Sequence, residues 1–149
     1  MGPIATIGYE KAPQAAVLER LKTAGVELLI DVRAVAASRR AGFSKTLLAG
    51  SLQQSGIDYL HLRDLGTPKS GRQAARAGRT DEMREIFEAH LQTAAAIGAL
   101  EQAIAASLGR RACLLCFEAD PACCHRAIVA DRISERTGAP VLHLRVDLA

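Results

Sequence analysis

Hydrophobic and polar positions follow two different periods along this chain, and the two periods alternate. Short, nearly continuous apolar runs predict five strands, at residues 4–8, 26–32, 57–62, 112–117 and 141–144. Between them, apolar residues recur every three or four positions, which predicts helices at 13–24, 44–55, 81–108 and 123–137. This alternation is typical of an α/β fold.

We therefore expect a single domain over residues 1–149, with three layers and a Rossmann-like architecture. A mostly parallel five-stranded sheet would carry helices on both faces. The run at 26–32 is almost wholly apolar, as in a strand that is covered on both sides. In such sheets ligands bind beyond the carboxyl ends of the strands, so the residues that follow each strand are the first candidates for a site.

The composition is that of an ordinary soluble protein, with 49% hydrophobic and 23% charged residues. No apolar run approaches the roughly 20 residues of a membrane span. The first residues lack the charged and apolar regions of a signal peptide. The four cysteines show no disulfide-like spacing. We expect a cytoplasmic protein with reduced thiols, no membrane partner and no cofactor; the composition leaves the oligomeric state open.

The segment 66–80 is basic and has few large apolar side chains. Its charged residues are four cations, Lys69, Arg72, Arg76 and Arg79. Together they exceed the net charge of +3 of the whole chain. We expect a solvated, mobile loop, and contact with an anion is the alternative.

The densest group of reactive side chains lies at the predicted strand 112–117 and the helix after it. Cys116 and Glu118 are two positions apart and share a face of the strand. Asp120 and Pro121 resemble a helix start, which would place Cys124 in the first turn, where the helix dipole stabilises a thiolate. Cys124 is therefore the candidate nucleophile, with His125 or Glu118 as the acid or base.

Basic side chains at other strand ends suggest an anionic ligand. Asp31 and Arg33 share a face at the end of the strand 26–32, where their simplest role is an ion pair. Arg33, Arg39 and Arg126 together offer guanidinium donors suited to a phosphate or a carboxylate. Tyr9 follows the first strand, and Cys116 would line the pocket.

Several familiar chemistries do not fit the spacing. A phosphatase loop needs an arginine six positions after its cysteine, and the chain has Val129 and Ala130 after Cys123 and Cys124. Cys113 and Cys116 would face opposite sides of one strand, unlike a redox pair. Glycine-rich phosphate-binding motifs are absent. Cys116, Glu118, Cys124 and His125 are too compactly spaced for an ordinary structural zinc site, so no metal is expected.

Taken in order, several motifs resemble one known family. They are Thr6-Ile7-Gly8-Tyr9, Leu29-Ile30-Asp31-Val32-Arg33, Ser38-Arg39, Tyr59, Leu115-Cys116-Phe117-Glu118 and Cys124-His125-Arg126. The combination resembles a bacterial and archaeal family of unknown function, DUF488, and covers the chain from Thr6 to His143. The resemblance implies no settled activity. It implies a family signature that adds Ser38 to the expected ligand-binding residues; the signature residues are Asp31, Arg33, Ser38, Arg39, Tyr59, Cys116, Glu118, Cys124, His125 and Arg126.

The sequence thus favours a small enzyme, or an enzyme-like domain, that acts on an anionic small molecule such as a nucleotide or a phosphorylated metabolite. A non-catalytic nucleic-acid-binding or adaptor module is one alternative. The scarcity of aromatic residues, at 3%, and the modest charge disfavour it. A thiol-based metal or redox sensor is the other alternative.

Overall fold

Five parallel strands form the central sheet of the protein in its computed structural model, which describes residues 2–146. The strands are β1 (Ile4–Gly8), β2 (Leu28–Asp31), β3 (Asp58–His61), β4 (Ala112–Cys116) and β5 (Val141–His143), in the order β3-β2-β4-β1-β5. Every neighbouring pair is parallel. The predicted α/β class with a five-stranded sheet is confirmed, and the sheet is parallel throughout the described residues.

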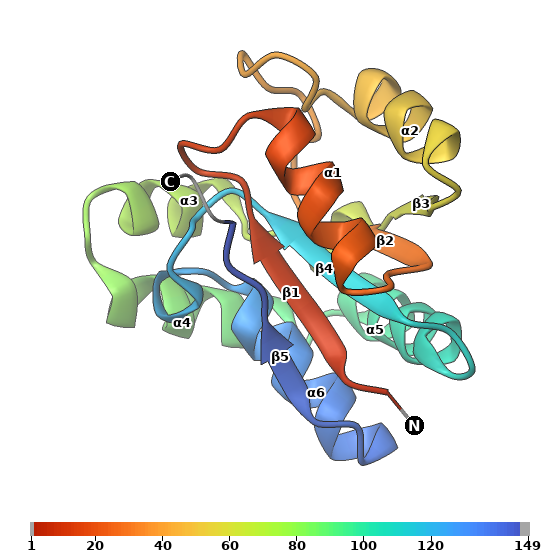
Figure 1. Cartoon of the computed structure of the whole chain (residues 1–149). Coiled ribbons are helices and arrows are strands. Elements are labelled where there is room, and N and C mark those ends of the chain that lie inside the picture. The colour runs from red at the N-terminus through yellow and green to blue at the C-terminus, as the bar shows by residue number, and fades with distance from the viewer. Residues whose placement is uncertain (1, 147–149) are drawn as a thin grey trace.

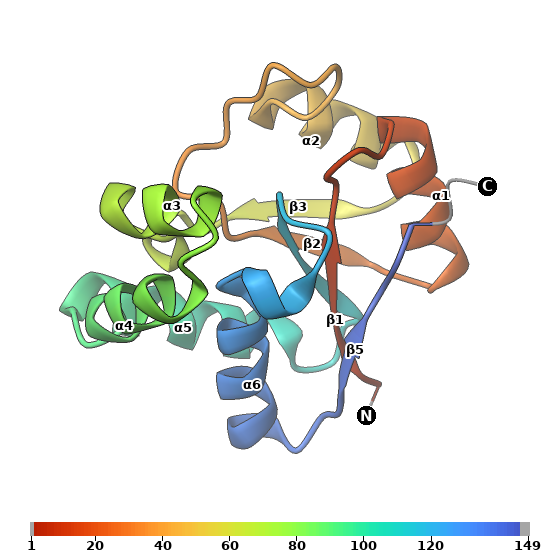
Figure 2. The ribbon, with the colours of Figure 1, turned by 90° about the vertical axis from the view of Figure 1, so that its left-hand side faces the viewer.

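Helices cover both faces of this sheet (Figures 1 and 2). They are α1 (Gln14–Thr23), α2 (Lys45–Gln54), α3 (Lys69–Arg76), α4 (Thr80–His90), α5 (Ala94–Ser107) and α6 (Arg126–Thr137). On one face, α1 and α2 pack their buried residues against Ile7, Leu29 and Leu115. On the other, α4, α5 and α6 pack against Ile30 and Leu114. The three-layer arrangement therefore matches the expectation.

The strand order brings the ends of β1, β2 and β4 together. β4 lies between β1 and β2, and Gly8 is level with Cys116 while Asp31 is level with Leu115. Chain segments that follow these strands therefore emerge side by side at the carboxyl edge of the sheet, where parallel α/β proteins bind ligands.

The basic segment 66–80 differs from the loop that the sequence predicts. It contains the helix α3, which packs on α4. Ala74 is fully buried, and Gly71 lies so close to Thr67 that an added Cβ would stand 2.1 Å from its methyl group. Small residues carry the burial here because the backbones approach closely, and a search for large apolar side chains misses such a helix.

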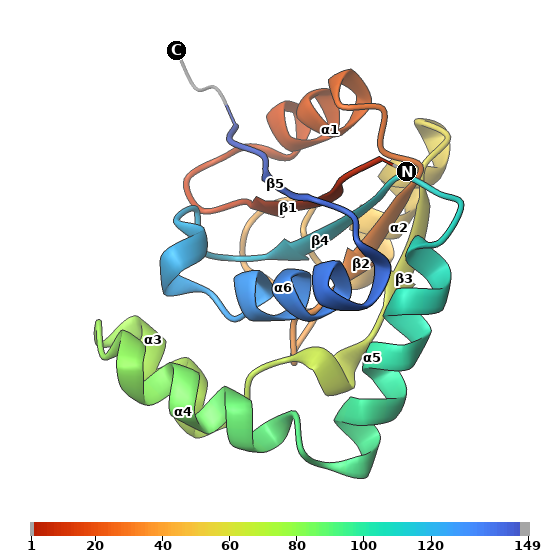
Figure 3. The same ribbon diagram turned by 90° about the horizontal axis from the view of Figure 1, so that it is seen from below.

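The predicted single helix 81–108 is two helices. α4 ends at His90, and α5 begins after Thr93, whose Oγ1 accepts a hydrogen bond from the backbone N–H of Ala96. This N-cap starts a new helix that runs at an angle to the first (Figure 3). The apolar period continues across the break, because both helices pack on the same core.

The last helix begins later than predicted. Asp120 caps a single 3₁₀ turn, Pro121–Cys123, by accepting a hydrogen bond from the N–H of Ala122. Cys124 is extended, and α6 begins only at Arg126. Cys124 therefore precedes the helix rather than lying in its first turn.

Of the helices in residues 2–146, none is both long and apolar enough to cross a bilayer.

Candidate active site

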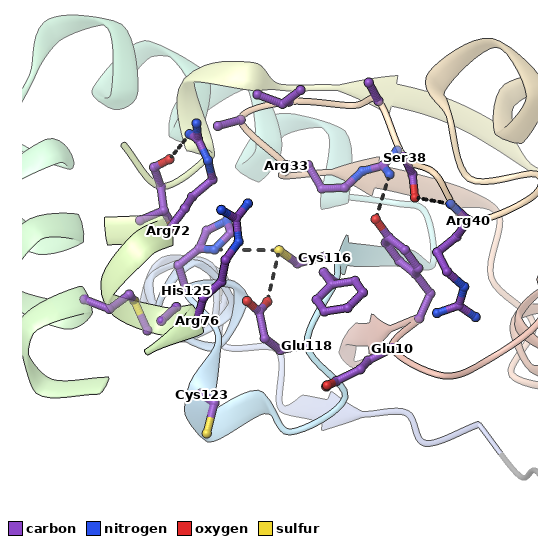
Figure 4. Close-up of a pocket in the computed structure, with 18 of the residues that line it drawn as sticks. Glu10, Arg33, Ser38, Arg40, Arg72, Arg76, Cys116, Glu118, Cys123 and His125 are labelled. Carbon is purple, nitrogen blue, oxygen red and sulfur yellow. Dashed lines mark hydrogen bonds between the residues drawn. The ribbon is translucent and has the colours of Figure 1, made fainter. Parts of the chain in front are cut away.

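A cavity of about 760 Å³ opens at the carboxyl edge of the sheet (Figure 4). Its walls come from the loop after β1, the loop after β2, the helix α3 and the segment after β4. The residues that carry its polar chemistry are Tyr9, Glu10, Arg33, Ser38, Arg39, Arg40, Thr67, Arg72, Arg76, Cys116, Glu118, Cys123 and His125. The exposed apolar side chains of Val35 and Phe117 also line it.

Five arginines line this cavity from two sides. Arg33, Arg39 and Arg40 come from the segment after β2, and Arg72 and Arg76 come from α3. Two of the guanidinium groups are held by backbone carbonyls: Arg40 donates to Ala12 and Arg72 donates to Thr67. Two carboxylates, Glu10 and Glu118, face the same space. Arginines therefore outnumber carboxylates in the lining of the cavity.

Arg33 is fixed by a buried network at the end of β2. Its Nη2 and Nε donate to the two oxygens of Asp31 at 2.7 and 2.9 Å, and its Nη1 donates to Tyr9 Oη at 3.1 Å. Tyr59 donates to the same Asp31 at 2.5 Å. Burial alone would lower the pKa of Arg33, but Asp31 outweighs it and raises that pKa. Arg33 is thus held charged and immobile at the cavity wall.

Tyr9 supports the same wall through its ring. The ring stacks on Phe43 with a centroid distance of 4.2 Å and meets Phe117 edge-on at 5.4 Å.

Tyr59 and Asp31 lie behind Arg33 in the same network. Burial and the hydrogen bond to Asp31 both raise the pKa of Tyr59, so its hydroxyl stays protonated. Asp31 itself is fully buried behind Arg33 and orients that side chain.

Cys116, Glu118 and His125 lie together in the cavity wall. The Sγ of Cys116 is 3.7 Å from Oε2 of Glu118 and 3.8 Å from Nδ1 of His125. Figure 4 shows the carboxylate of Glu118 directed at this sulfur. Cys116 faces the α6 side of the sheet, and Cys113 is in the core on the α1 side. The two cysteines of the C-x-x-C therefore lie on opposite sides of β4, as predicted.

The hydrogen bonds of His125 define its tautomer. Its Nε2 lies 2.7 Å from the carbonyl oxygen of Val32, which only accepts, so Nε2 carries a proton. In the neutral ring Nδ1 is then an acceptor, and it faces Cys116 at 3.8 Å and Cys124 at 3.9 Å. One imidazole nitrogen is therefore shared between two thiols.

The thiols of Cys116 and Cys124 shift each other's pKa in opposite directions. Burial opposes charge on Cys124, but a hydrogen bond from Cys116 and the positive charge of His125 lower the pKa of Cys124 well below its ordinary value. That hydrogen bond, burial and the Cys124 charge raise the pKa of Cys116. Burial lowers the pKa of His125, but the charge on Cys124 raises it. The net change is an increase in the pKa of His125. Burial also raises the pKa of Cys113, which has no such partner among residues 2–146.

Glu118 and Arg126 meet through the backbone rather than as an ion pair. Burial, followed by the charge on Cys124, raises the pKa of Glu118 to about 7. Arg126 is fully buried and donates from Nη1 to the carbonyl oxygen of Glu118 at 2.5 Å and from Nη2 to that of Ala119 at 3.3 Å. Its guanidinium thus braces the segment after β4 from behind.

The structure brings most of the predicted site residues to one place. Those that line the cavity are Tyr9, Arg33, Ser38, Arg39, Cys116, Glu118 and His125. Within residues 2–146, the lining does not include Asp31, Cys124 or Arg126, which lie directly behind it. Asp31 positions Arg33, Cys124 contacts His125, and Arg126 holds the backbone of Glu118. The expectation that Arg126 contacts the ligand itself therefore has no support from its place in the fold.

Sequence reasoning misses three arginines of the cavity, Arg40, Arg72 and Arg76. It places Arg72 and Arg76 in a basic loop that is expected to be solvated, with contact with an anion as the alternative. Their spacing of four positions is the signal that could have found them, because residues i and i+4 share one face of a helix. Recognition of α3 would have placed both on a common face.

Cys123 is a further residue of the lining. Its sulfur donates to Asp120 and points away from Cys116 (Figure 4).

The donor set at the inner end of the cavity also has the composition of a metal site. One donor atom each from Cys116, Cys124 and His125 lie within 4.8 Å of one another, and all three residues are buried. Thiolate and imidazole are the ligands that zinc prefers in proteins.

Comparison with known proteins identifies a family without assigning an activity. A family model described as a domain of unknown function, DUF488, matches residues 13–133 of the 149-residue chain. The match includes the segments that carry Arg33, Cys116 and His125. Among curated proteins none matches the chain, and the same holds for solved structures.

Proposed function

This chain belongs to the DUF488 family, and we propose that its cavity binds an anionic small molecule and presents it to the Cys116 thiol for covalent reaction. A nucleotide or a phosphorylated metabolite is the ligand class that we favour. One observation carries the proposal: five arginines surround a single cavity in whose wall a cysteine contacts both an imidazole and a carboxyl group.

The arginines supply the binding energy for the anion. Arg33 is held in place by Asp31 and Tyr9, so its remaining donor positions are oriented before a ligand arrives. Arg39 and Arg76 are exposed at the opening and add positive potential. These charges are gathered inside a cavity rather than spread over a surface, which favours a small molecule over a nucleic acid.

Cys116 rather than Cys124 is the proposed attacking group, because it is the Cys116 side chain that lines the cavity. Its sulfur forms a bond to the electrophilic atom of the bound anion, and the leaving group departs with the electrons of the bond that breaks. The thiol proton of Cys116 passes to the pair formed by Cys124 and His125, which contact each other at 3.9 Å. Glu118, which also faces the cavity, protonates the leaving group.

Arg126 and Asp31 act in this scheme as positioning residues. Arg126 fixes the backbone of Glu118, and Asp31 fixes the guanidinium of Arg33. The reaction needs reduced thiols, so we place the protein in the cytoplasm, where thiols stay reduced.

Binding of pyrophosphate and of inorganic phosphate, measured by titration calorimetry at low salt, tests the anion-binding part of the proposal. We expect binding that weakens with added salt and falls about tenfold in the double variant Arg39→Ala/Arg76→Ala. Neither arginine has a side-chain hydrogen bond among the described residues, so the fold should be unaffected. Failure of pyrophosphate to bind, or equal binding by the double variant, would contradict this role.

A further inference from the structure

We propose that Cys116, Cys124 and His125 form a binding site for one soft divalent cation, with Zn²⁺ as the best match, and that the ion blocks the thiol chemistry of the cavity. The binding itself rests on the geometry of these three residues. The blocking effect rests on the function proposed above, because a sulfur that coordinates a metal cannot attack a ligand.

The distances between the donor atoms fit a tetrahedral ion. With Zn–S near 2.3 Å and Zn–N near 2.0 Å, neighbouring sulfur and nitrogen ligands stand roughly 3.6 Å apart. The Nδ1 of His125 lies 3.8 Å from one sulfur and 3.9 Å from the other, and all three donor atoms lie within 4.8 Å of one another. An ion at their centre thus needs shifts of only a few tenths of an ångström at the nitrogen.

The imidazole is oriented as in a metal site. A histidine that binds a metal through one nitrogen generally donates the other N–H to a carbonyl or carboxylate. His125 does this with the carbonyl of Val32 and directs Nδ1 at the two sulfurs. His61 and His90 also bond to backbone carbonyls through Nε2, at Arg33 and Asp64. Neither His61 nor His90, however, belongs to the cluster of three donors formed by Cys116, Cys124 and His125.

The local fold explains why compact spacing does not prevent this site. Cys116 ends β4, and Cys124 and His125 follow only after the 3₁₀ turn Pro121–Cys123. The turn reverses the chain and returns Cys124 to the side of Cys116, so the two thiols come from separate segments. The expectation of no metal rests on sequence spacing alone, and the return of the chain removes that objection.

The fourth ligand position faces the cavity. Glu118 Oε2 lies 3.7 Å from the Cys116 sulfur on that side, but it is outside the group of donors that lie within 4.8 Å of one another, so its carboxylate must turn toward the ion to become the fourth ligand. Two thiolates neutralise a divalent ion. A carboxylate as the fourth ligand would leave the whole site with one negative charge. The buried guanidinium of Arg126 donates to the carbonyl oxygen of Glu118 beside the cluster, and its Nε has no hydrogen-bond partner among residues 2–146. The surroundings of the cluster therefore tolerate this charge.

Competition of the reduced, metal-free protein with a chromophoric chelator for Zn²⁺ tests the proposal. We expect one Zn²⁺ per chain in the wild type. Cys116→Ser and Cys124→Ser should each weaken binding by more than the roughly 10- to 100-fold that loss of a hydrogen-bond partner of a metal-binding histidine causes. Cys123→Ser is the matched control and should bind like the wild type, because the Cys123 thiol contacts Asp120 instead.

Two further readouts keep the result interpretable if a variant folds poorly. Co²⁺ added to the wild type should give the sulfur-to-cobalt charge-transfer band of a thiolate site. Zn²⁺ should protect Cys116 and Cys124, but not Cys123, from alkylation in the wild type. Wild-type binding no tighter than that of Cys116→Ser/Cys124→Ser, or equal weakening by Cys123→Ser, would overturn the metal site. If Zn²⁺ fails to bind while pyrophosphate still binds the metal-free protein, only this inference falls and the proposed function stands.

Discussion

The Nδ1 atom of His125 lies 3.8 Å from the sulfur of Cys116, with the opposite ring nitrogen held by the carbonyl of Val32. The carbonyl keeps a proton on Nε2, so in the neutral ring the nitrogen that faces the sulfur is the one able to accept. A cysteine that would otherwise be an inert buried residue at a strand end thereby gains a proton acceptor. This relationship links the fold to the proposed chemistry.

Replacement of His125 should slow the alkylation of Cys116 selectively. In metal-free protein treated with iodoacetamide, His125→Gln should lower the labelling rate of Cys116 by about tenfold or more, because the proton acceptor is lost. The rate at Cys123 should not change, since its sulfur contacts Asp120. Mass-spectrometric mapping of partly labelled native protein gives both rates.

In the wild type, Cys113 should stay unlabelled because it is fully buried. Labelling of Cys113 at the rate of Cys116 would contradict the assignment of Cys116 as the reactive thiol.

Gly8→Ala should disrupt the segment that carries Glu118. A Cβ at Gly8 would stand 1.8 Å from the carbonyl oxygen of Glu118, so the backbone must move. We expect a loss of about 3 kcal/mol or more in the free energy of unfolding, measured by urea denaturation. Gly98→Ala is the control: that position is helical, and nothing lies within 4 Å of the added atom. The control should gain about 0.5–1 kcal/mol. Equal effects of the two changes would contradict the close approach.

Asp31→Asn should destabilise the protein through Arg33. The pair is buried, and neutralising one partner of a buried ion pair costs about 3–5 kcal/mol. Tyr59→Phe removes only the hydroxyl that donates to the same carboxylate and should cost about 1–2 kcal/mol. Thermal or urea unfolding of both variants measures the difference. A loss in Asp31→Asn no larger than that in Tyr59→Phe would show that Asp31 does not hold Arg33.

The elements with large apolar side chains are predictable from the sequence. Apolar runs locate all five strands. Because parallel strands place ligands at their carboxyl ends, the strand positions alone are enough to bring Arg33, Cys116 and Glu118 into one region, and all three line the cavity. The N-cap of Asp120 is also predictable, because an acid before a proline is a local signal.

Features that depend on close backbone approach or on distant contacts are not predictable in this way. The helix α3 buries Gly71 and Ala74, which leave no hydrophobic stripe in the sequence. Its arginines reach the cavity only because α3 packs beside the site. The sequence does not show that Cys116 lines the cavity while Cys124 lies behind it, because this order depends on where the 3₁₀ turn ends and α6 begins.

The central claim is that arginines in this cavity draw an anion to the Cys116 sulfur, and the ratio of alkylation by iodoacetate to that by iodoacetamide tests it most directly. The two reagents form the same bond to sulfur and release the same iodide, but only iodoacetate is anionic. In metal-free protein we predict a higher ratio at Cys116 than at Cys123. The ratio at Cys116 should fall about threefold in Arg76→Ala, since a nearby unit charge in a partly solvated cavity contributes on that scale. It should not change in Lys69→Ala, which removes the same charge from the same helix outside the cavity. Equal ratios at Cys116 and Cys123, or equal effects of the two variants, would contradict the claim.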